Sequence, residues 1–257
     1  MEIIENPKRL FKYASSDIAK IILRTSSIKF SPPNDFNDPF DCDIDLVDFH
    51  FPSDQQLDKE VAYEIEVLKK QFKNWPGFSE KSKDKSFWET GYKESQIGKI
   101  KSCGISCFSL VNNSVLMWSH YAEKHFGICL EFDNTISPRF ENLSDATDIS
   151  EGIVGYTEYE RINYMSTERK YAIFKIFLSK SGSWSHENEY RMILLNDKPQ
   201  IQKFKPQFLK AIYFGLRTSD REQNEIISMC TTLGFVDIGF FKCTKSDLSI
   251  RFSKITV

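Results

Sequence analysis

The pattern of apolar and polar positions divides the chain into many short strands and a few amphipathic helices. Apolar runs or two-residue alternation predict strands at 7–13, 28–30, 103–110, 127–133, 152–160, 184–195, 208–215, 236–243 and 248–255. Helical spacing predicts helices at 15–25, 55–72, 115–125, 166–180 and 219–234. Strands outnumber helices and do not alternate with them regularly. This favours an α+β fold with a mixed, mostly antiparallel sheet over a doubly wound one.

The first helix is predicted to bury one stripe of isoleucines. Ile18, Ile21 and Ile22 recur at helical spacing, and Ser16 or Asp17 provides the N-cap. Farther along, Ser114 is placed to cap the helix that begins at Val115.

The chain is expected to form one α+β domain over residues 1–257, with a helical insertion at 55–101. The insertion begins with apolar residues spaced as on one helix face and continues through a lysine-rich, weakly patterned stretch. A length of 257 residues suffices for a single large core.

Composition narrows the functional classes. A net charge of −2 shows no global excess that would favour nucleic acid or an anionic membrane, and 22 phenylalanines against 11 glycines suit an aromatic, β-rich core. No apolar run is long enough to span a bilayer, and the N-terminal residues do not resemble a signal peptide. The six cysteines contain no CxxC pair. A cytoplasmic protein with reduced thiols and no membrane partner is therefore expected.

The stretch WSHENEYRMILL, residues 184–195, carries the most distinctive polar pattern. Read as a strand, it puts Glu187, Glu189 and Arg191 on one face and Tyr190 and Met192 on the other. One interpretation is a half-buried strand with a charged, solvent-facing surface. The other is that one glutamate acts as a general base or stabilises a developing positive charge.

Two further stretches hold candidate binding residues. In LMWSHYAEKHFG, His120 and His125 leave a helix on different faces, so a metal pair is not expected, and Met117, Trp118 and Tyr121 share a stripe typical of core. In FSPPNDFNDPFD, Phe36 and Phe40 are expected to anchor a loop. That loop would then present Asn37, Asp38 and Asp41 rigidly toward a substrate.

Together these stretches resemble a widespread bacterial family of uncharacterised function. Its members share an FNDPFD loop, a W-x-H-Y-A helix and a W-x-x-E-x-E-Y-R strand, and the resemblance covers residues 10–41 and 103–215.

A second resemblance, to the ADP-ribosyltransferases, comes from the order LFKY, ISCFS with its following helix, and ENEYRMIL. It implies a split-sheet fold in which Glu189 stabilises a ribosyl oxocarbenium ion, Glu187 activates the acceptor, and Ser109 or Ser106 orients Glu189. Lys12 and Tyr13 stand where that family has Arg or His. The remaining residues assigned to substrate binding are Asn37, Asp38, Trp118, His120, Tyr121, Trp184 and Arg191, with Arg191 either pairing with a diphosphate or neutralising the glutamates.

The leading hypothesis is therefore a protein that binds NAD, as substrate rather than cofactor, and transfers ADP-ribose to a protein or nucleic-acid acceptor or hydrolyses it. A rival is a non-enzymatic module that senses a nucleotide or partner, for example in bacterial stress or phage defence. A third is a metal-dependent nuclease built on Asp38, Asp41, His120 and Glu189.

Overall fold

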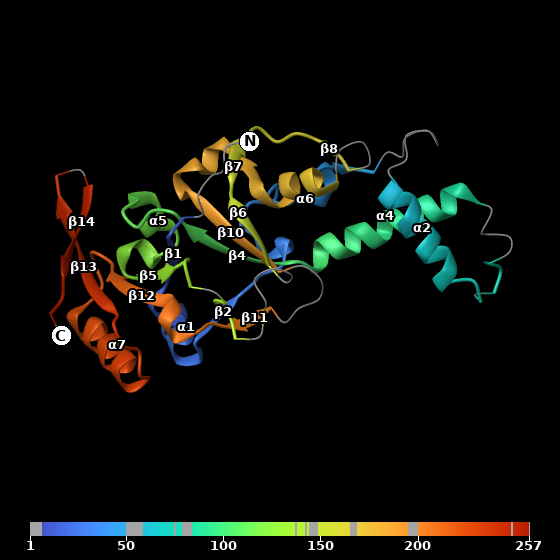
Figure 1. Cartoon of the computed structure of the whole chain (residues 1–257). Coiled ribbons are helices and arrows are strands. Elements are labelled where there is room, and N and C mark those ends of the chain that lie inside the picture. The colour runs from blue at the N-terminus through green and yellow to red at the C-terminus, as the bar shows by residue number, and fades with distance from the viewer. Residues whose placement is uncertain are drawn as a thin grey trace.

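A computed structural model describes residues 7–49, 59–74, 76–78, 84–136, 138–141, 143, 149–164, 169–194, 200–247 and 249–256. Its main feature is an eight-stranded sheet in the order β14-β13-β12-β5-β1-β4-β10-β6 (Figure 1). From β14 to β6 the strands are Ser249–Lys254, Gly239–Ser246, Leu209–Phe214, Ile128–Asp133, Arg9–Ala14, Gly104–Ser109, Glu189–Leu194 and Ile149–Ile153. Only β12 and β13 pair in parallel within this sheet, so the predicted α+β class and its mostly antiparallel sheet are confirmed.

The remaining described elements are short strand pairs and helices. The pairs are β2 (Ser27–Lys29) with β11 (Ile201–Lys203), β3 (Val47–Asp48) with β8 (Ile162–Asn163), and β7 (Gly155–Thr157) with β9 (Ser179–Ser181). The α-helices are α1 (Ser16–Thr25), α2 (Lys59–Gln71), α4 (Lys85–Ser102), α5 (Val115–His120), α6 (Arg169–Leu178) and α7 (Asp220–Thr232). Single 3-10 turns lie at Pro33–Asp35, Ile44–Leu46, Glu123–His125 and Pro206–Phe208, and a longer one, η4, covers Gly182–Glu187.

The two faces of the main sheet are covered differently. On one face a continuous apolar core joins alternate residues of the central strands to α1 and α7. The opposite face, called the α5/α6 face here, carries two separate apolar clusters. One lies under α5 around Trp118, and the other joins Ile193 of β10 to α6 and the end of α4. The polar side chains discussed below lie between these two clusters.

The sheet is nearly divided between β1 and β4. These strands pair at a single position, Phe11 opposite Ser109, whereas β1 pairs with β5 at six positions. Lys12 occupies part of the gap, because its ammonium donates to the carbonyl oxygen of Cys107 at 3.0 Å and to the hydroxyl of Ser106 at 3.2 Å. A side chain thus replaces the backbone hydrogen bonds that a regular strand pair would form.

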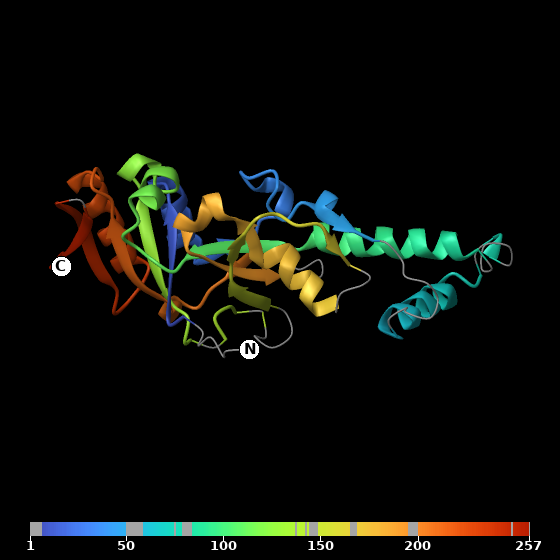
Figure 2. The same cartoon turned by 90° about the horizontal axis from the view of Figure 1, so that it is seen from above.

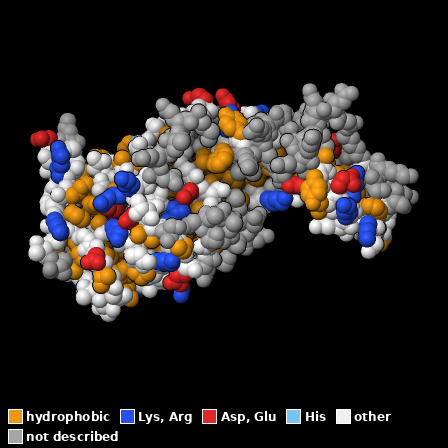
Figure 3. Space-filling view, viewed as in Figure 1, with side chains coloured by type: hydrophobic (Ala, Val, Ile, Leu, Met, Phe, Trp, Pro, Cys, Tyr) orange, Lys and Arg blue, Asp and Glu red, His pale blue; other side chains and the backbone are white. Residues whose placement is uncertain are grey.

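The predicted insertion at 55–101 corresponds to α2 and α4, which extend away from the sheet (Figures 1 and 2). Residues 55–58, 75 and 79–83 of it lie outside the described residues. Near its C-terminal end, α4 returns to the body and buries Ile100 in the cluster beneath α6. In Figure 3, Lys and Arg side chains are interspersed with Asp, Glu and apolar side chains on the described part of the visible face, as the small net charge suggests. No helix of the described residues is long and apolar enough to cross a membrane.

Predictions for α1 and for the stretch 184–195 are wrong in part. In α1 the buried residues include Ala19, Ile22 and Leu23, while Ile18 and Ile21 are 50% and 54% exposed; Ser15, not Ser16 or Asp17, is the N-cap. The stretch 184–195 is not one strand, because residues up to Glu187 belong to η4 and β10 begins at Glu189. All of β10 is buried, so the predicted solvent-facing charged surface does not exist.

Candidate functional site

A cleft of about 480 Å³ lies on the α5/α6 face, at the gap between β1 and β4. It is called the central cleft. Its lining comes from β1, the loop at 35–41, β4, α5 and the segment 180–189. The stretches FSPPNDFNDPFD, LMWSHYAEKHFG and WSHENEYRMILL therefore meet around a single cavity, although they are far apart in the chain. Of the predicted site residues, the lining includes Lys12, Tyr13, Asn37, Ser109, His120, Tyr121, Glu187 and Glu189.

Arg191 lies beneath the cleft and binds two of the carboxylates that line it. It is fully buried and donates two hydrogen bonds to each of two carboxylates: to Asp41 at 2.9 and 2.6 Å, and to Glu189 at 2.8 and 3.0 Å. Its guanidinium also donates to the carbonyl oxygen of Phe177 at 2.8 Å and lies 5.4 Å from the ring centre of Phe36. Arg191 thus neutralises buried acids and fixes their orientation.

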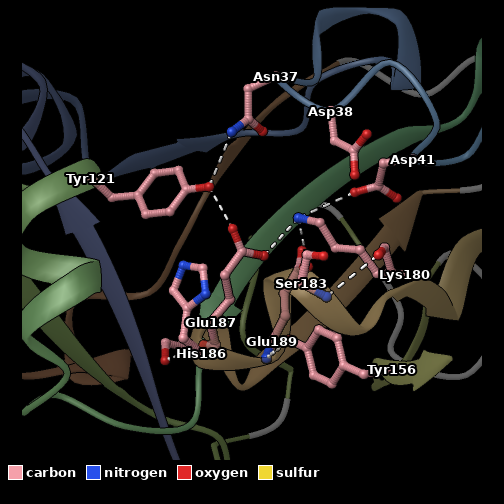
Figure 4. Close-up of polar contacts among 12 residues, drawn as sticks. Asn37, Asp38, Asp41, Tyr121, Tyr156, Lys180, Ser183, His186, Glu187 and Glu189 are labelled. Atoms are coloured by element: carbon pink, nitrogen blue, oxygen red, sulfur yellow. Dashed lines mark hydrogen bonds and ion pairs between the residues drawn. The ribbon is translucent and has the colours of Figure 1, made fainter. Parts of the chain in front are cut away.

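Lys180 is the second buried cation, and sequence reasoning missed it. Its ammonium lies 2.6 Å from Glu187, 3.3 Å from Asp41 and 3.6 Å from Glu189 (Figure 4). The cluster thus holds three buried carboxylates and two buried cations, and Lys12 on the opposite wall of the cleft is a third cation that interacts electrostatically with Glu189. Glu187 and Glu189 both border the cleft.

Glu187 and Glu189 reach the same cleft because of a turn, not because of strand alternation. Asn188, which separates them, has the left-handed conformation with φ 44°, and its backbone ends η4. Glu187 then accepts a hydrogen bond from the Tyr121 hydroxyl on the side opposite to Lys180, and Asn37 donates to that hydroxyl at 3.2 Å (Figure 4). Residues from three separate elements thereby hold one carboxylate at the cleft wall.

The surroundings shift several proton affinities. Burial opposes ionisation of Glu189, but the Arg191 guanidinium, with a smaller contribution from Lys180, outweighs it and lowers the pKa of Glu189. Burial likewise opposes the charged form of Lys180, yet the neighbouring carboxylates raise the pKa of Lys180 above its usual range. Burial and the Glu187 carboxylate raise the pKa of Tyr121. Glu189 is therefore a fixed, ionised carboxylate at the cleft.

The opposite wall comes from β1. Burial lowers the pKa of Lys12, whose ammonium also lies 5.0 Å from the ring centre of Phe108. Tyr13 is buried and donates to the carbonyl oxygen of Val111 at 2.9 Å. Lys12 thus presents an ammonium group to the cleft from this wall. Tyr13 presents its ring, because its hydroxyl is bound to Val111.

The serines do not have the role that the sequence implied. The Ser109 hydroxyl donates to the backbone carbonyl oxygen of Glu187 at 2.7 Å, and Ser106 is bound by Lys12. Ser109 therefore positions the Glu187 backbone, whereas Arg191 and Lys180 orient the carboxylate of Glu189.

The loop 36–41 is held differently from the prediction. Phe36 lines the cleft and packs with the core, but Phe40 is 55% exposed and is not an anchor. Asp41 fastens the loop instead through Arg191 and Lys180.

Asp38 is buried outside the cleft, where it accepts hydrogen bonds from the Phe40 amide at 3.0 Å and the Tyr159 hydroxyl at 2.8 Å. Asp38 therefore shapes the loop and does not face a ligand in the cleft.

Three more predicted binding residues lie outside the cleft lining. Trp118 is fully buried beneath α5, with its indole N–H donating to the Asn112 carbonyl oxygen at 2.7 Å, so it is a core residue. Trp184 is half-buried, and Lys180 lies 4.8 Å from its ring centre. Arg191 is sealed from the cavity, so of its two predicted roles only neutralisation of the glutamates agrees with the structure.

His120 is exposed and lines the cleft, and its ring lies 6.1 Å from that of His186. Among the described residues, no group of three or more His, Cys, Asp or Glu is arranged to hold a metal ion. Of the acids proposed for a nuclease, Asp41 and Glu189 both line the cleft but are bound to Arg191, and Asp38 lies outside it.

With this geometry established, comparison with known proteins adds one match. Residues 117–192 match a family described as "Protein of unknown function (DUF2971)". The match supports the resemblance to an uncharacterised family. It includes Tyr121, Lys180, Glu187, Glu189 and Arg191, but not β1 or the loop at 36–41. No curated protein and no solved structure matches the chain.

Proposed function

We propose that the chain binds NAD or a related nucleotide in the central cleft and breaks its nicotinamide–ribose bond, transferring ADP-ribose or releasing it to water. The observation that carries this proposal is the pair of buried carboxylates, Glu187 and Glu189, held in fixed positions at the cleft. Breaking that bond builds positive charge on the ribose, and a fixed carboxylate stabilises such charge where water cannot reorganise around it.

The bond between the ribose anomeric carbon and the nicotinamide nitrogen breaks, and its electron pair leaves with nicotinamide. Glu189 faces the resulting cationic carbon, which an acceptor hydroxyl, amine or water attacks. Glu187 accepts the proton that the acceptor loses, and Tyr121 keeps that carboxylate in position. The products are nicotinamide and an ADP-ribosyl acceptor, or free ADP-ribose when water attacks.

The rest of the cleft suits such a substrate. Its volume lies in the range of pockets that hold small ligands. Phe11, Phe36 and Tyr121 offer aromatic surface for the nicotinamide ring, and Lys12 offers a cation for the diphosphate.

The test is to incubate the purified chain with NAD and follow nicotinamide by chromatography, with mass spectrometry of candidate protein and nucleic-acid acceptors. Glu189→Gln is expected to slow release by about 100-fold or more, because the amide keeps the shape and loses the charge. Glu141→Gln, at an exposed position, should match the wild type. Equal rates in Glu189→Gln and wild type would exclude this role.

Since Glu189→Gln alters a buried charge cluster, a milder variant is needed beside it. Tyr121→Phe removes one hydroxyl next to Glu187 and is expected to fold and to lower the rate of release by about tenfold or more. Tyr63→Phe, on a side chain that is 69% exposed, is its control.

One observation favours the rival of a nucleotide-sensing module without turnover. Both oxygens of Glu189 are bound by Arg191, and those of Glu187 by Tyr121 and Lys180, so the acids are satisfied without a ligand. Under this rival, calorimetry detects NAD binding that Tyr121→Phe weakens, while no nicotinamide appears.

A further inference from the structure

A second cleft of about 520 Å³ opens on the same face of the sheet, over β5, β12 and β13. It shares no lining residue with the central cleft. The two are neighbours all the same, because the ring of Phe11, in the central cleft, contacts that of Tyr213, in the second cleft, at a centroid distance of 6.2 Å.

A single row of paired residues connects the two clefts across six strands. The strand register aligns, in order, Gly239, Ala211, Glu131, Phe11, Ser109 and Glu189. Residues paired in this way point to the same face of a sheet. Glu131 and Glu189 are therefore three strand spacings apart, about 14 Å, on one continuous surface.

The floor of the second cleft is flat because its residues are small. Ala211 and Gly239 are adjacent in register. A Cβ atom at position 239 would lie 2.7 Å from Cε2 of Phe241, so glycine is what leaves room beside this ring. Phe241 stacks on Tyr213 at 4.9 Å and 15°, and it is only half-buried. The cleft thus offers a supported aromatic ring next to an open floor.

A buried carboxylate lies beside that ring. Glu131 is 1% exposed and accepts hydrogen bonds from the hydroxyl of Tyr213 and from the guanidinium of Arg9. The side chain of Arg9 is 67% exposed and comes from the rim, so a ligand can displace it without disturbing the core. A carboxylate in this position accepts hydrogen bonds from sugar hydroxyls.

The lining carries more positive than negative charge, with Lys8, Arg9 and Lys210 against Glu131 and Asp133. Neither Lys8 nor Lys210 forms an ion pair with another described residue. Asp133 accepts hydrogen bonds from the amide and hydroxyl of Thr135 at 2.9 and 2.5 Å; burial opposes its ionisation, but these bonds and the nearby charges of Lys210 and Arg9 lower its pKa. Two ammonium groups above an aromatic floor suit a ligand that joins a planar ring to an anion.

We propose that the second cleft binds a nucleoside phosphate, with its base on Phe241, its ribose hydroxyls at Glu131 and its phosphate between Lys8 and Lys210. The ligand is either a separate nucleotide or the adenosine half of a dinucleotide whose other end lies in the central cleft.

The test is calorimetric titration of the full chain with AMP. Phe241→Leu removes the stacking ring and Lys210→Ala removes one ammonium, and each is expected to weaken AMP binding by about tenfold. Lys245→Ala is the matched control: Lys245 is exposed, lies on the same strand and points to the same face as Gly239, but outside the cleft. Its AMP affinity should equal that of the wild type.

Competition separates the two sources of the nucleotide. If saturating NAD prevents AMP binding, the second cleft holds the adenosine half of the dinucleotide. If AMP still binds to the NAD complex, the cleft is a separate nucleotide site.

No AMP binding at millimolar concentration, or an affinity unchanged in both variants, would overturn the proposal. These outcomes are independent of nicotinamide release. If the chain binds AMP through Phe241 but does not cleave NAD, the nucleotide site in the second cleft stands and the proposed activity of the central cleft is excluded.

Discussion

Arg191 and Asp41 are 150 residues apart in the sequence, yet their side chains meet through two parallel hydrogen bonds of 2.9 and 2.6 Å. Both residues are buried. The pair fastens the loop at 36–41 to β10, and Glu189, bound to the same guanidinium, lines the cleft beside that loop. Arg191 thus connects the loop at 36–41, through Asp41, to Glu189 at the start of β10.

Replacing Arg191 by leucine should destabilise the fold strongly. Asp41 and Glu189 would remain buried with only Lys180 near them, and breaking a buried ion pair costs about 3–5 kcal/mol. Urea unfolding of Arg191→Leu measures the loss. Arg221→Leu, at an exposed position of α7, should change the free energy of unfolding by less than about 0.5 kcal/mol. A loss equally small for Arg191→Leu would contradict the role given to this arginine.

Stability should depend on pH through Glu189. Its pKa is lowered in the folded chain, whereas an unfolded glutamate titrates near about 4.3. The ionised carboxylate therefore stabilises the fold above that value, and this contribution disappears as the pH falls through the lower, folded pKa. The difference in unfolding free energy between wild type and Glu189→Gln should be largest near about pH 7 and shrink below about pH 4. Glu141→Gln should show no such trend.

Lys180→Met should be more damaging at high than at low pH. Without this ammonium, Asp41 and Glu189 keep Arg191 as their ion-pair partner and Glu187 keeps only the hydrogen bond from the Tyr121 hydroxyl, so the negative charge of the three carboxylates is less well compensated. A cost of about 3–5 kcal/mol is expected near about pH 8, and a smaller one near about pH 5, where protonation relieves the repulsion. Unfolding at both pH values measures this difference. Lys175→Met, whose partner Glu160 is 72% exposed, should cost little at either pH.

Trp118→Phe should lower the free energy of unfolding without changing the affinity for nucleotide. It removes the hydrogen bond to the Asn112 carbonyl oxygen and leaves a gap in the core, which together cost about 1–3 kcal/mol. Because Trp118 does not line the central cleft, nucleotide affinity measured by calorimetry should stay the same. Tyr121→Phe is the matched comparison from the same segment, and it should weaken nucleotide binding. If Trp118→Phe weakened nucleotide binding and Tyr121→Phe did not, Trp118 would have to be assigned to the binding site.

The sequence predicted most strands of the main sheet and most helices, because local periodicity and capping specify them, but it did not predict the short strands β3, β8, β9 and β11. Ser114, for example, is the cap of α5 as expected. Face assignments failed where burial depends on distant parts of the chain. In β10, alternation placed Tyr190 and Arg191 on opposite faces, but α6 and the loop at 36–41 cover the charged face as well. A strand that is buried on both sides cannot be recognised by alternation when one face is ionic.

The motifs located the central cleft but not its electrostatics. Glu187, Glu189 and Tyr121 were singled out because they stand in distinctive stretches. Lys180 follows an apolar helix and resembles a surface lysine that ends it. Only the tertiary structure brings three carboxylates around its ammonium. In the sequence, the only hint of a second cation was that the acidic residues of the candidate site outnumber its one arginine.

The single paired position between β1 and β4 also has a mechanical consequence. A sheet joined here by one residue pair loses few backbone hydrogen bonds along this line, so the seam is held mainly by the Lys12 side chain and by the apolar core that both halves share. Amide hydrogens along the seam should then exchange with solvent faster than those between β1 and β5, where six pairs must separate together. The seam is therefore expected to be the least protected line of the main sheet.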